Sequence, residues 1–513
     1  MQKKQTILVV ASLLVVVLSV TLAYFTAQII GKGKDVTINS ADLQIIFTDS
    51  DGSISGSNIE PGKWDATKTF TIENKSNETY KYNIVIQDLV NTFVTEGYLQ
   101  YKITSTNGGY NMTEFKDVPK SETAKDTILA YSVSIPVGVT QTYTVEFIYK
   151  NDESVDQSDD MGKTLSGKLF ITEGTEASTL LSQILKDNPT RSTRSNNNNG
   201  TNDFATPLTT TTTGTLFTST ESITGITDSP KEVYYFAGNT TKNWVKFANL
   251  YWRIIRTNHD GSIRLLYVGT SHDTTGGNIG TSAFNTNSNS TKYVGYKYGE
   301  DTSLDTIRNN TTDSTIKTYI DTWYQNNLTN YTKYLSTSAV YCNDRSEGTG
   351  QTYNYTSSPS SKFNFAPYYR MDYDTDGAAA NPSYSCSDIR DAFSVDNTSA
   401  KLDYPVSLMT ADEITFAGGV AFQTMSTPYA WFISNSAGTQ VSTSWWSLSP
   451  IDWSGSIASV WGWYSGVAGL DNGLVNGSNA VRPALSLKSC IKYSTGNGAP
   501  ETPYEIVETE TGC

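Results

Sequence analysis

Histidine, cysteine and positive charge are all scarce in this chain. Its 513 residues include two histidines and four cysteines, and 37 Lys and Arg stand against 51 Asp and Glu, for a formal charge of −14. His259 and His272 fall in a predicted hairpin turn and a Gly/Thr loop, so we interpret both as surface residues. This disfavours a Ser-His-Asp triad or a zinc site. Because nucleic-acid binding requires clustered basic residues, the charge balance also argues against a nucleic-acid partner.

A long apolar run stands at the N-terminus. After Lys3 and Lys4, residues 7–25 are largely apolar, about the length that a helix needs to cross a bilayer. The two lysines predict that the start of the run stays inside the cell. Residues 21–23 offer the small side chains of a signal-peptidase site, so a retained anchor and a cleaved signal both stay open. We therefore predict that residues 1–30 are a signal or transmembrane segment, with the remainder on the extracellular face of the membrane or secreted.

Residues 35–174 alternate apolar and polar side chains with a period of two. The pattern is clear at 80–86 and 143–149, and turn signals such as Asp51-Gly52 separate the stretches. This predicts an all-β sandwich of seven or more strands, acting as a stalk or spacer. The motifs LAYFT, LQII, EPG and FTIEN, which start at residues 22, 43, 60 and 70, resemble camelysin-type secreted proteins of Gram-positive bacteria. That resemblance implies a fibre-forming or surface-attached domain.

A polar segment separates this domain from the C-terminal half. A short helix is expected at 179–186, ended by Asn188-Pro189. Asparagine and threonine runs follow, and they hold too little apolar surface to offset the entropy of ordering. We predict a flexible linker at 187–229, with a strand or two near its end, and a ligand-binding head at 231–508.

The head combines strands with two short helices. Asp260-Gly261 supplies a tight turn between apolar stretches, which predicts a β-hairpin over 251–267. Ser314 can cap a helix over 313–328, whose apolar spacing includes Tyr319 and Trp323. A capping box starts a second helix at 410–413. Few helices among many strands indicate an α+β domain.

Five motifs of the head occur in the order seen in uncharacterised membrane-anchored surface proteins of gut Firmicutes. They are YWRIIR at 251, YCNDRS at 341, LMTADE at 408, WWSLSP at 445 and VRPAL at 481. The tryptophan-rich end also resembles the C-type-lectin-like fold shared by formylglycine-generating enzymes and by variable receptors of diversity-generating retroelements. The resemblance implies a C-type-lectin-like ligand-binding domain, and function must still be argued from the site.

The segment between Trp445-Trp446 and Arg482-Pro483 is the predicted ligand-binding face. Aromatic rings with short polar side chains suit glycans and equally suit adaptable protein paratopes. We interpret Trp445, Trp446 and Trp461 as more probable core residues, and we expect Arg482 to bind loop carbonyls or a carboxylate. The candidate ligand-binding residues are Asp452, Trp453, Ser459, Trp461, Trp463, Tyr464, Asp471, Asn472 and Asn476.

The four cysteines are Cys342, Cys386, Cys490 and Cys513. In a secreted chain they predict two disulfides, with the sequential pairing as one of the open connectivities. A formylglycine-generating oxidoreductase would instead need a reactive, copper-handling pair. No cofactor is predicted; the loop Asp372-Tyr373-Asp374-Thr375-Asp376-Gly377 resembles the start of an EF-hand, which leaves a weak Ca²⁺ site open beside a solvated acidic loop.

These observations favour a bacterial cell-surface binding protein, or adhesin, over an enzyme. Its expected ligand is an extracellular glycan or protein, and its expected attachment is to the membrane through the N-terminal helix. The alternatives are a structural protein of a pilus-like or biofilm-matrix fibre and an oxidoreductase of the formylglycine-generating type.

Overall fold

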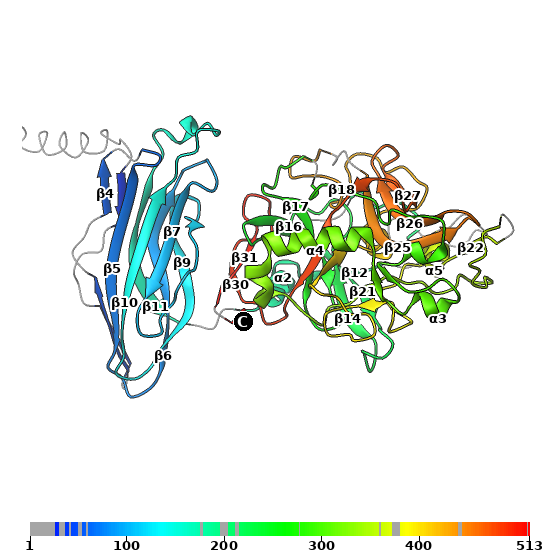
Figure 1. Cartoon of the computed structure of the whole chain (residues 1–513). Coiled ribbons are helices and arrows are strands. Elements are labelled where there is room, and N and C mark those ends of the chain that lie inside the picture. Colours follow the sequence, from blue (N-terminus) through cyan, green and yellow to red (C-terminus); the bar gives the residue numbers. More distant parts are fainter. Residues whose placement is uncertain are drawn as a thin grey trace, which may run out of the picture. The chain divides into compact units, whose positions relative to one another are not determined.

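A computed structural model describes most of the chain (Figure 1). The described residues are 26–29, 36–40, 43–49, 54–57, 60–174, 178–194, 204–210, 215–275, 277–358, 361–371, 380–439, 444–509 and 511–513. Within these ranges, no helix has the length and apolar character that a membrane crossing requires. Most of the predicted anchor, residues 1–25 and 30, lies outside the described residues, and residues 26–29 of that segment form a strand.

The chain divides into two compact units, Met1–Ala177 and Ser178–Cys513. The first unit is all-β and consists of two sheets. One sheet has the strand order β4 (Ile54–Ser57), β1 (Thr26–Ile29), β11 (Leu165–Glu173), β6 (Tyr80–Asn91) and β9 (Ser121–Ile135). The other has the order β2 (Val36–Ser40), β3 (Leu43–Asp49), β5 (Trp64–Asn74), β10 (Thr140–Tyr149), β7 (Leu99–Ser105) and β8 (Lys116–Asp117).

One core joins the two sheets of the first unit. Tyr82 and Ile84 from β6 are buried with Phe70 from β5 and with Val145 and Phe147 from β10. The alternation seen in the sequence places these side chains on the inner faces, because successive side chains of a strand point to opposite faces. The all-β prediction for this part of the chain is therefore confirmed.

The second unit, Ser178–Cys513, is called the head unit below. Its larger sheet follows the order β12 (Thr190–Thr193), β13 (Thr215–Glu221), β14 (Lys231–Tyr235), β16 (Leu250–Thr257), β15 (Trp244–Phe247), β31 (Tyr504–Ile506) and β30 (Tyr493–Thr495). β17 (Ile263–Gly269) joins β16 to β29 (Pro483–Leu487), which also pairs with β24 (Val406–Leu408).

The second sheet of the head unit contains the tryptophan-rich segment. Its order is β18 (Thr281–Ser282), β28 (Asn479–Ala480), β25 (Trp445–Trp453), β26 (Ala458–Tyr464) and β27 (Gly469–Leu474), and β22 (Phe363–Asn364) also pairs with β25. Two small ladders pair β19 (Lys297–Tyr298) with β20 (Thr312–Asp313) and β21 (Tyr341–Cys342) with β23 (Ala392–Phe393).

Short helices complete the head unit. They are α2 (Leu180–Asp187), α3 (Leu304–Ile307), α4 (Thr315–Asn327), α5 (Ala366–Met371) and α6 (Ala411–Phe416), with 3-10 turns at η3 (Thr291–Val294) and η4 (Thr329–Tyr334). The predicted capping box is present, because Thr410 and Glu413 each bond the other's backbone N–H at the start of α6. The predicted hairpin is also present as β16 and β17, with Gly261 at a φ of 76° in its turn.

The head unit starts earlier in the chain than expected. Residues 187–229 are the expected linker, with a strand or two near its end; β13 lies near that end, and β12 lies at its start. β13 pairs antiparallel with β14, and Leu180 of α2 belongs to the core of the head unit. The polar composition of this stretch gives little sign of β12, because that strand depends on pairing with β13, and β13 on pairing with β14, more than on its own apolar surface.

Candidate functional site

Helix α4, labelled in Figure 1, supplies most of the residues that line the candidate site. Its start is set by Ser314, whose side-chain oxygen accepts a hydrogen bond from the backbone N–H of Lys317 at 3.2 Å. Ile316, Ile320 and Tyr324 are fully buried in the core of the head unit. This buried stripe fixes the rotation of the helix, so that the opposite stripe faces outward.

The outward stripe of α4 lines a cavity of about 680 Å³, which we call the α4 groove. Such a volume lies within the usual range for small-molecule sites. Most of its lining side chains are hydroxyls and amides, and two are aromatic. The lining residues are Ile279, Ser282, Asp313, Ser314, Thr315, Thr318, Tyr319, Thr322, Trp323, Asn326 and Asn327.

Trp323 has an exposure that sets it apart from the other tryptophans of the head unit. It is partly exposed in the groove, whereas each of the other eight is at most 1% exposed. Its ring is held by edge contacts with Tyr267, at 5.4 Å between centroids, and with Trp252, at 6.5 Å. Contacts of this kind orient an aromatic ring without covering it completely. The groove therefore has a fixed aromatic surface.

Tyr319 supplies the second aromatic ring of the groove. Its hydroxyl donates to the carbonyl of Ile279 at 3.1 Å. Gly280 follows with a φ of +125°, and a β-carbon there would lie 2.2 Å from the Tyr319 hydroxyl oxygen. The absence of a side chain at residue 280 thus allows Tyr319 to reach the loop before β18.

Two of the three threonines that line the groove use their hydroxyl protons within the helix. Thr318 donates to the carbonyl of Ser314 at 3.2 Å, and Thr322 donates to that of Thr318 at 2.8 Å. Because a hydroxyl oxygen also has two lone pairs, each can still accept a hydrogen bond from a ligand. Asn326 adds an exposed amide, which can both donate and accept.

An ion cluster surrounds the buried Lys317 in the first turns of α4. The ammonium of Lys317, which is 0% exposed, contacts carboxylate oxygens of Asp313 at 3.0 Å, Asp321 at 2.5 Å and Asp403 at 2.6 Å. Lys297 also contacts Asp313, at 3.1 Å. The three carboxylates are close enough to one another to hold a metal ion. In this structure the Lys317 ammonium lies among them and pairs with all three, and Lys297 supplies a second positive charge at Asp313.

The cluster shifts the pKa values of its members. Burial lowers the pKa of Lys317, but the charges and hydrogen bonds of Asp321, Asp403 and Asp313 outweigh burial and raise it above its ordinary value. Burial raises the pKa of Asp321 despite the nearby ammonium. The hydrogen bond from Lys317 lowers the pKa of Asp403, the most exposed of the three carboxylates. Near neutral pH we therefore expect Lys317 to be charged.

The structure places Trp453, Trp461 and Trp463 in the core of the head unit, which for Trp461 is the role that the sequence favoured. Trp453 is 1% exposed, and Trp461 and Trp463 are 0% exposed. They lie on β25 and β26, inner strands of the second sheet, and are covered by elements from elsewhere in the chain: Phe363 pairs with Trp453, and Phe432 packs edge-on against Trp463. A side chain enclosed in this way cannot stack on a ligand.

The six polar or tyrosine candidates do not form one surface. Asp452 lies opposite Ser459 on the neighbouring strand, and Asn472 lies opposite Trp461. Asp471, which precedes Asn472, lies opposite Gly462, so its side chain points to the other face of the sheet. Burial raises the pKa of Asp452, with a smaller opposing contribution from a hydrogen bond to Ser459. Ser459 is buried; Asp452, Tyr464 and Asp471 are partly buried; Asn472 and Asn476 are exposed.

The α4 groove was not predicted from the sequence, because Tyr319 and Trp323 fit the apolar spacing of the helix and were assigned to its buried face. The useful signal was the second stripe, in which Thr315, Thr318, Thr322 and Asn326 recur at helical spacing. Tyr319 and Trp323 lie at the border of the two stripes. Residues at such a border can contact both the core and a ligand.

The predicted structural role of Arg482 is confirmed. Its guanidinium donates to the carbonyl of Phe432 at 2.5 Å and to that of Tyr267 at 3.2 Å, and it lies over the ring of Trp445. Arg482 therefore connects the end of the second sheet to β17 and to the loop that holds Phe432.

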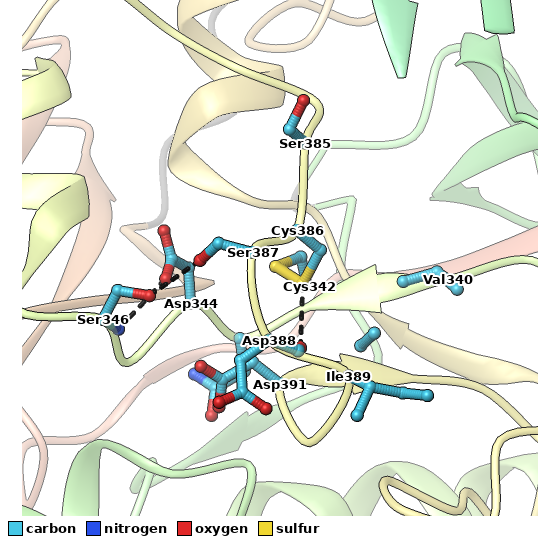
Figure 2. Close-up of a disulfide and its surroundings, with 12 residues drawn as sticks. Val340, Cys342, Asp344, Ser346, Ser385, Cys386, Ser387, Asp388, Ile389 and Asp391 are labelled. Atoms are coloured by element: carbon cyan, nitrogen blue, oxygen red, sulfur yellow. Dashed lines mark hydrogen bonds between the residues drawn. A yellow bond between two sulfur atoms is a disulfide. The ribbon is translucent and has the colours of Figure 1, made fainter. Parts of the chain in front are cut away.

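The two predicted disulfides are present with sequential pairing, Cys342–Cys386 and Cys490–Cys513. Figure 2 shows the first, which joins β21 to the loop before Asp388, and beside it the hydroxyls of Ser346 and Ser387 lie 2.9 Å apart. The predicted calcium loop at 372–377 lies outside the described residues.

Comparisons with known proteins find little in common with this chain. No family model matches it, and no curated protein matches it. Among solved structures, one described as "AvmM Catalyzes Macrocyclization in Alchivemycin A Biosynthesis" covers 29% of this chain and 100% of its own, at 12% identity and a TM-score of 0.15. A likeness at that level carries no conclusion about fold or activity.

Proposed function

We propose that this protein is a bacterial cell-surface or secreted binding protein whose head unit recognises an extracellular glycan in the α4 groove. The observation that carries the proposal is the ring of Trp323, held by Trp252 and Tyr267 and left partly exposed beside hydroxyl and amide groups. A sugar has apolar C–H patches that pack on a ring face and hydroxyls that bond polar side chains, and the groove offers both kinds of surface.

The proposed location and architecture rest on further features. Two disulfides are typical of proteins that mature in an oxidising compartment. The apolar N-terminal run and the resemblance of the head to surface proteins support an anchor or signal at 1–30, a sandwich stalk and a C-type-lectin-like head. In this proposal the protein binds its ligand without chemical conversion.

A glycan is favoured over a peptide ligand by the lining of the groove. Peptide recognition commonly uses a free sheet edge or a continuous apolar groove. The α4 groove is instead lined by a helix whose backbone groups are already bonded, and seven of its eleven lining residues are Ser, Thr or Asn. Such a surface supplies many side-chain hydrogen bonds and little continuous apolar area.

The test is a glycan array probed with the purified full chain and with groove variants. Thr322→Val and Asn326→Ala remove exposed polar groups with little expected effect on folding, and Trp323→Ala removes the aromatic surface. Tyr355→Ala is the matched control, since Tyr355 is a 48% exposed aromatic residue outside the groove lining. We expect the groove variants to weaken the same glycan signals and the control to leave them unchanged.

Two results would contradict the proposal. Glycan signals that survive Trp323→Ala would place the binding site elsewhere, provided that thermal unfolding shows a folded variant. Retention of a peptide on a parallel peptide array, lost in the same groove variants, would show that the groove binds a protein ligand.

A further inference from the structure

We infer that the α4 groove selects uncharged saccharides and rejects those that carry a carboxylate, sulfate or ammonium group. This inference rests on the proposed function and specifies the chemical class of its ligand. It starts from the composition of the lining. Among the described residues, the groove lining contains no Lys, Arg or His, and Asp313 is its only carboxylate.

The carboxylate of Asp313 is already paired on both oxygens. One oxygen lies 3.1 Å from the ammonium of Lys297, and the other lies 3.0 Å from that of Lys317. Lys317 is completely buried and also contacts Asp321 and Asp403. An ammonium group on a ligand would therefore have to compete with two lysines that the fold already holds in place.

The start of α4 does not provide an anion site either. A helix N-terminus binds anions through its unbonded backbone N–H groups. Here the N–H of Thr315 donates to Asn285, that of Ile316 to the carbonyl of Phe284, and that of Lys317 to Ser314. These groups are all occupied, so a carboxylate or sulfate in the groove would have no donor there.

A charged ligand group would consequently lose water without gaining an opposite charge. Burying a charge that is not paired is strongly unfavourable, whereas hydroxyl and acetamido groups can form hydrogen bonds with Thr318, Thr322 and Asn326. The same reasoning predicts that binding hardly depends on salt, because screening acts only on interactions between charges.

The experiment compares saccharides that share a backbone and differ in charge. Each uncharged glycan retained on the array in a Trp323-dependent manner is titrated against the full chain beside its C6-oxidised counterpart, which carries carboxylates. Chitin oligosaccharides and their deacetylated forms, which carry ammonium groups, make a second matched pair. We expect each charged member to bind at least about tenfold more weakly than its uncharged partner, since its charge is left without a counterion.

A pair of variants separates charge from shape. Asp313→Asn removes the one carboxylate of the described groove lining, and with it the repulsion of an anionic ligand, so it should recover severalfold affinity for the oxidised saccharide. Asp321→Asn is the control, because it removes a carboxylate from the same cluster but not from the groove lining. The uncharged saccharide should bind both variants as it binds the unaltered protein.

The outcomes distinguish this inference from the function on which it rests. Equal binding of charged and uncharged members, lost in Trp323→Ala, overturns the charge selectivity and leaves the proposed function standing. Tighter binding of a charged member overturns the selectivity as well. An array without any Trp323-dependent signal contradicts the proposed function, and therefore also the charge selectivity that depends on it.

Discussion

The hydroxyl of Tyr319 and the backbone of Gly280 lie in direct contact. A β-carbon on residue 280 would lie only 2.2 Å from that hydroxyl oxygen, and the same hydroxyl donates to the carbonyl of Ile279. The contact joins helix α4 to the loop before β18, which form two walls of the α4 groove. Gly280 therefore positions the ring of Tyr319, one of the two aromatic rings of the groove, although Gly280 is not itself a lining residue.

Replacing Gly280 by Ala should destabilise the head unit and displace Tyr319. We expect a loss of about 2–3 kcal/mol in the free energy of unfolding, from overpacking and from the positive φ. Tyr319→Phe alone should cost about 1 kcal/mol, the value of one hydrogen bond. The double variant should lose less free energy of unfolding than the two single variants together, because phenylalanine lacks the oxygen that clashes with the alanine side chain. Urea unfolding measures all three, and strictly additive losses would disprove the contact.

Lys317 should be necessary for stability because it is the one cation that contacts all three carboxylates of the cluster. Lys317→Met keeps the apolar stem and removes the charge, which leaves Asp313, Asp321 and Asp403 facing one another. We expect the free energy of unfolding to fall by about 2 kcal/mol, less than for a fully buried ion pair, because Asp313 keeps Lys297 and Asp403 is 55% exposed to water. Lys292→Met, at a more exposed lysine that lies 3.7 Å from Glu300, is the control and should change little.

Calcium should restore part of the stability that Lys317→Met loses. Oxygen ligands from three carboxylates suit Ca²⁺, and the ion would replace the missing ammonium. Thermal unfolding with and without millimolar Ca²⁺ tests this. Stabilisation of the variant and not of the unaltered protein is the expected result, whereas equal shifts in both proteins would indicate a calcium site elsewhere.

Acid should destabilise the head unit through Glu221. Burial alone would raise the pKa of this residue, but Arg256, at 2.8 Å, and hydrogen bonding from His259 outweigh it and lower the pKa from 4.5 to about 2. The folded state thus binds this proton less readily than the unfolded state. The stabilisation, about 3 kcal/mol, is fully present above pH 4.5 and is lost as the pH falls towards 2.

The check is the pH dependence of urea unfolding for Glu221→Gln. The variant should be less stable near neutral pH, because Arg256 loses one partner, and its stability should fall less steeply between pH 4.5 and 2. Glu501→Gln, at an exposed carboxylate, should retain the full slope. An unchanged slope in Glu221→Gln would mean that other buried acids determine the acid sensitivity.

Local signals predicted the local structure of the head unit. Asp260-Gly261 marked a hairpin, Ser314 marked the start of a helix, and Thr410 with Glu413 marked a capping box; all three are present. Each depends on contacts between residues close in sequence. Turn and cap geometry is decided within a few residues, so a single sequence is sufficient to predict it.

Burial and pairing could not be predicted in the same way. Trp453 is paired across the sheet with Phe363, which lies 90 positions earlier in the chain, and nothing near residue 453 indicates that pairing. The strand at 190–193 depends similarly on a parallel pairing with residues 215–218. A tryptophan among glycines and serines suits a binding face or a core equally well, and the distant strands determine which it is.

Trp463 and Trp323 should therefore respond differently to substitution. Trp463 is 0% exposed and packs edge-on against Phe432 at 5.0 Å, so Trp463→Ala should lower the free energy of unfolding by about 3–5 kcal/mol. Trp323 is partly exposed, and its loss should cost less stability but abolish glycan binding. Unfolding and array binding are measured for both variants under conditions where each is folded. A Trp463→Ala variant that keeps its stability but loses binding would place the binding site in the segment between Trp445 and Arg482. Loss of binding without loss of stability is the effect of removing a ligand contact, not a core residue.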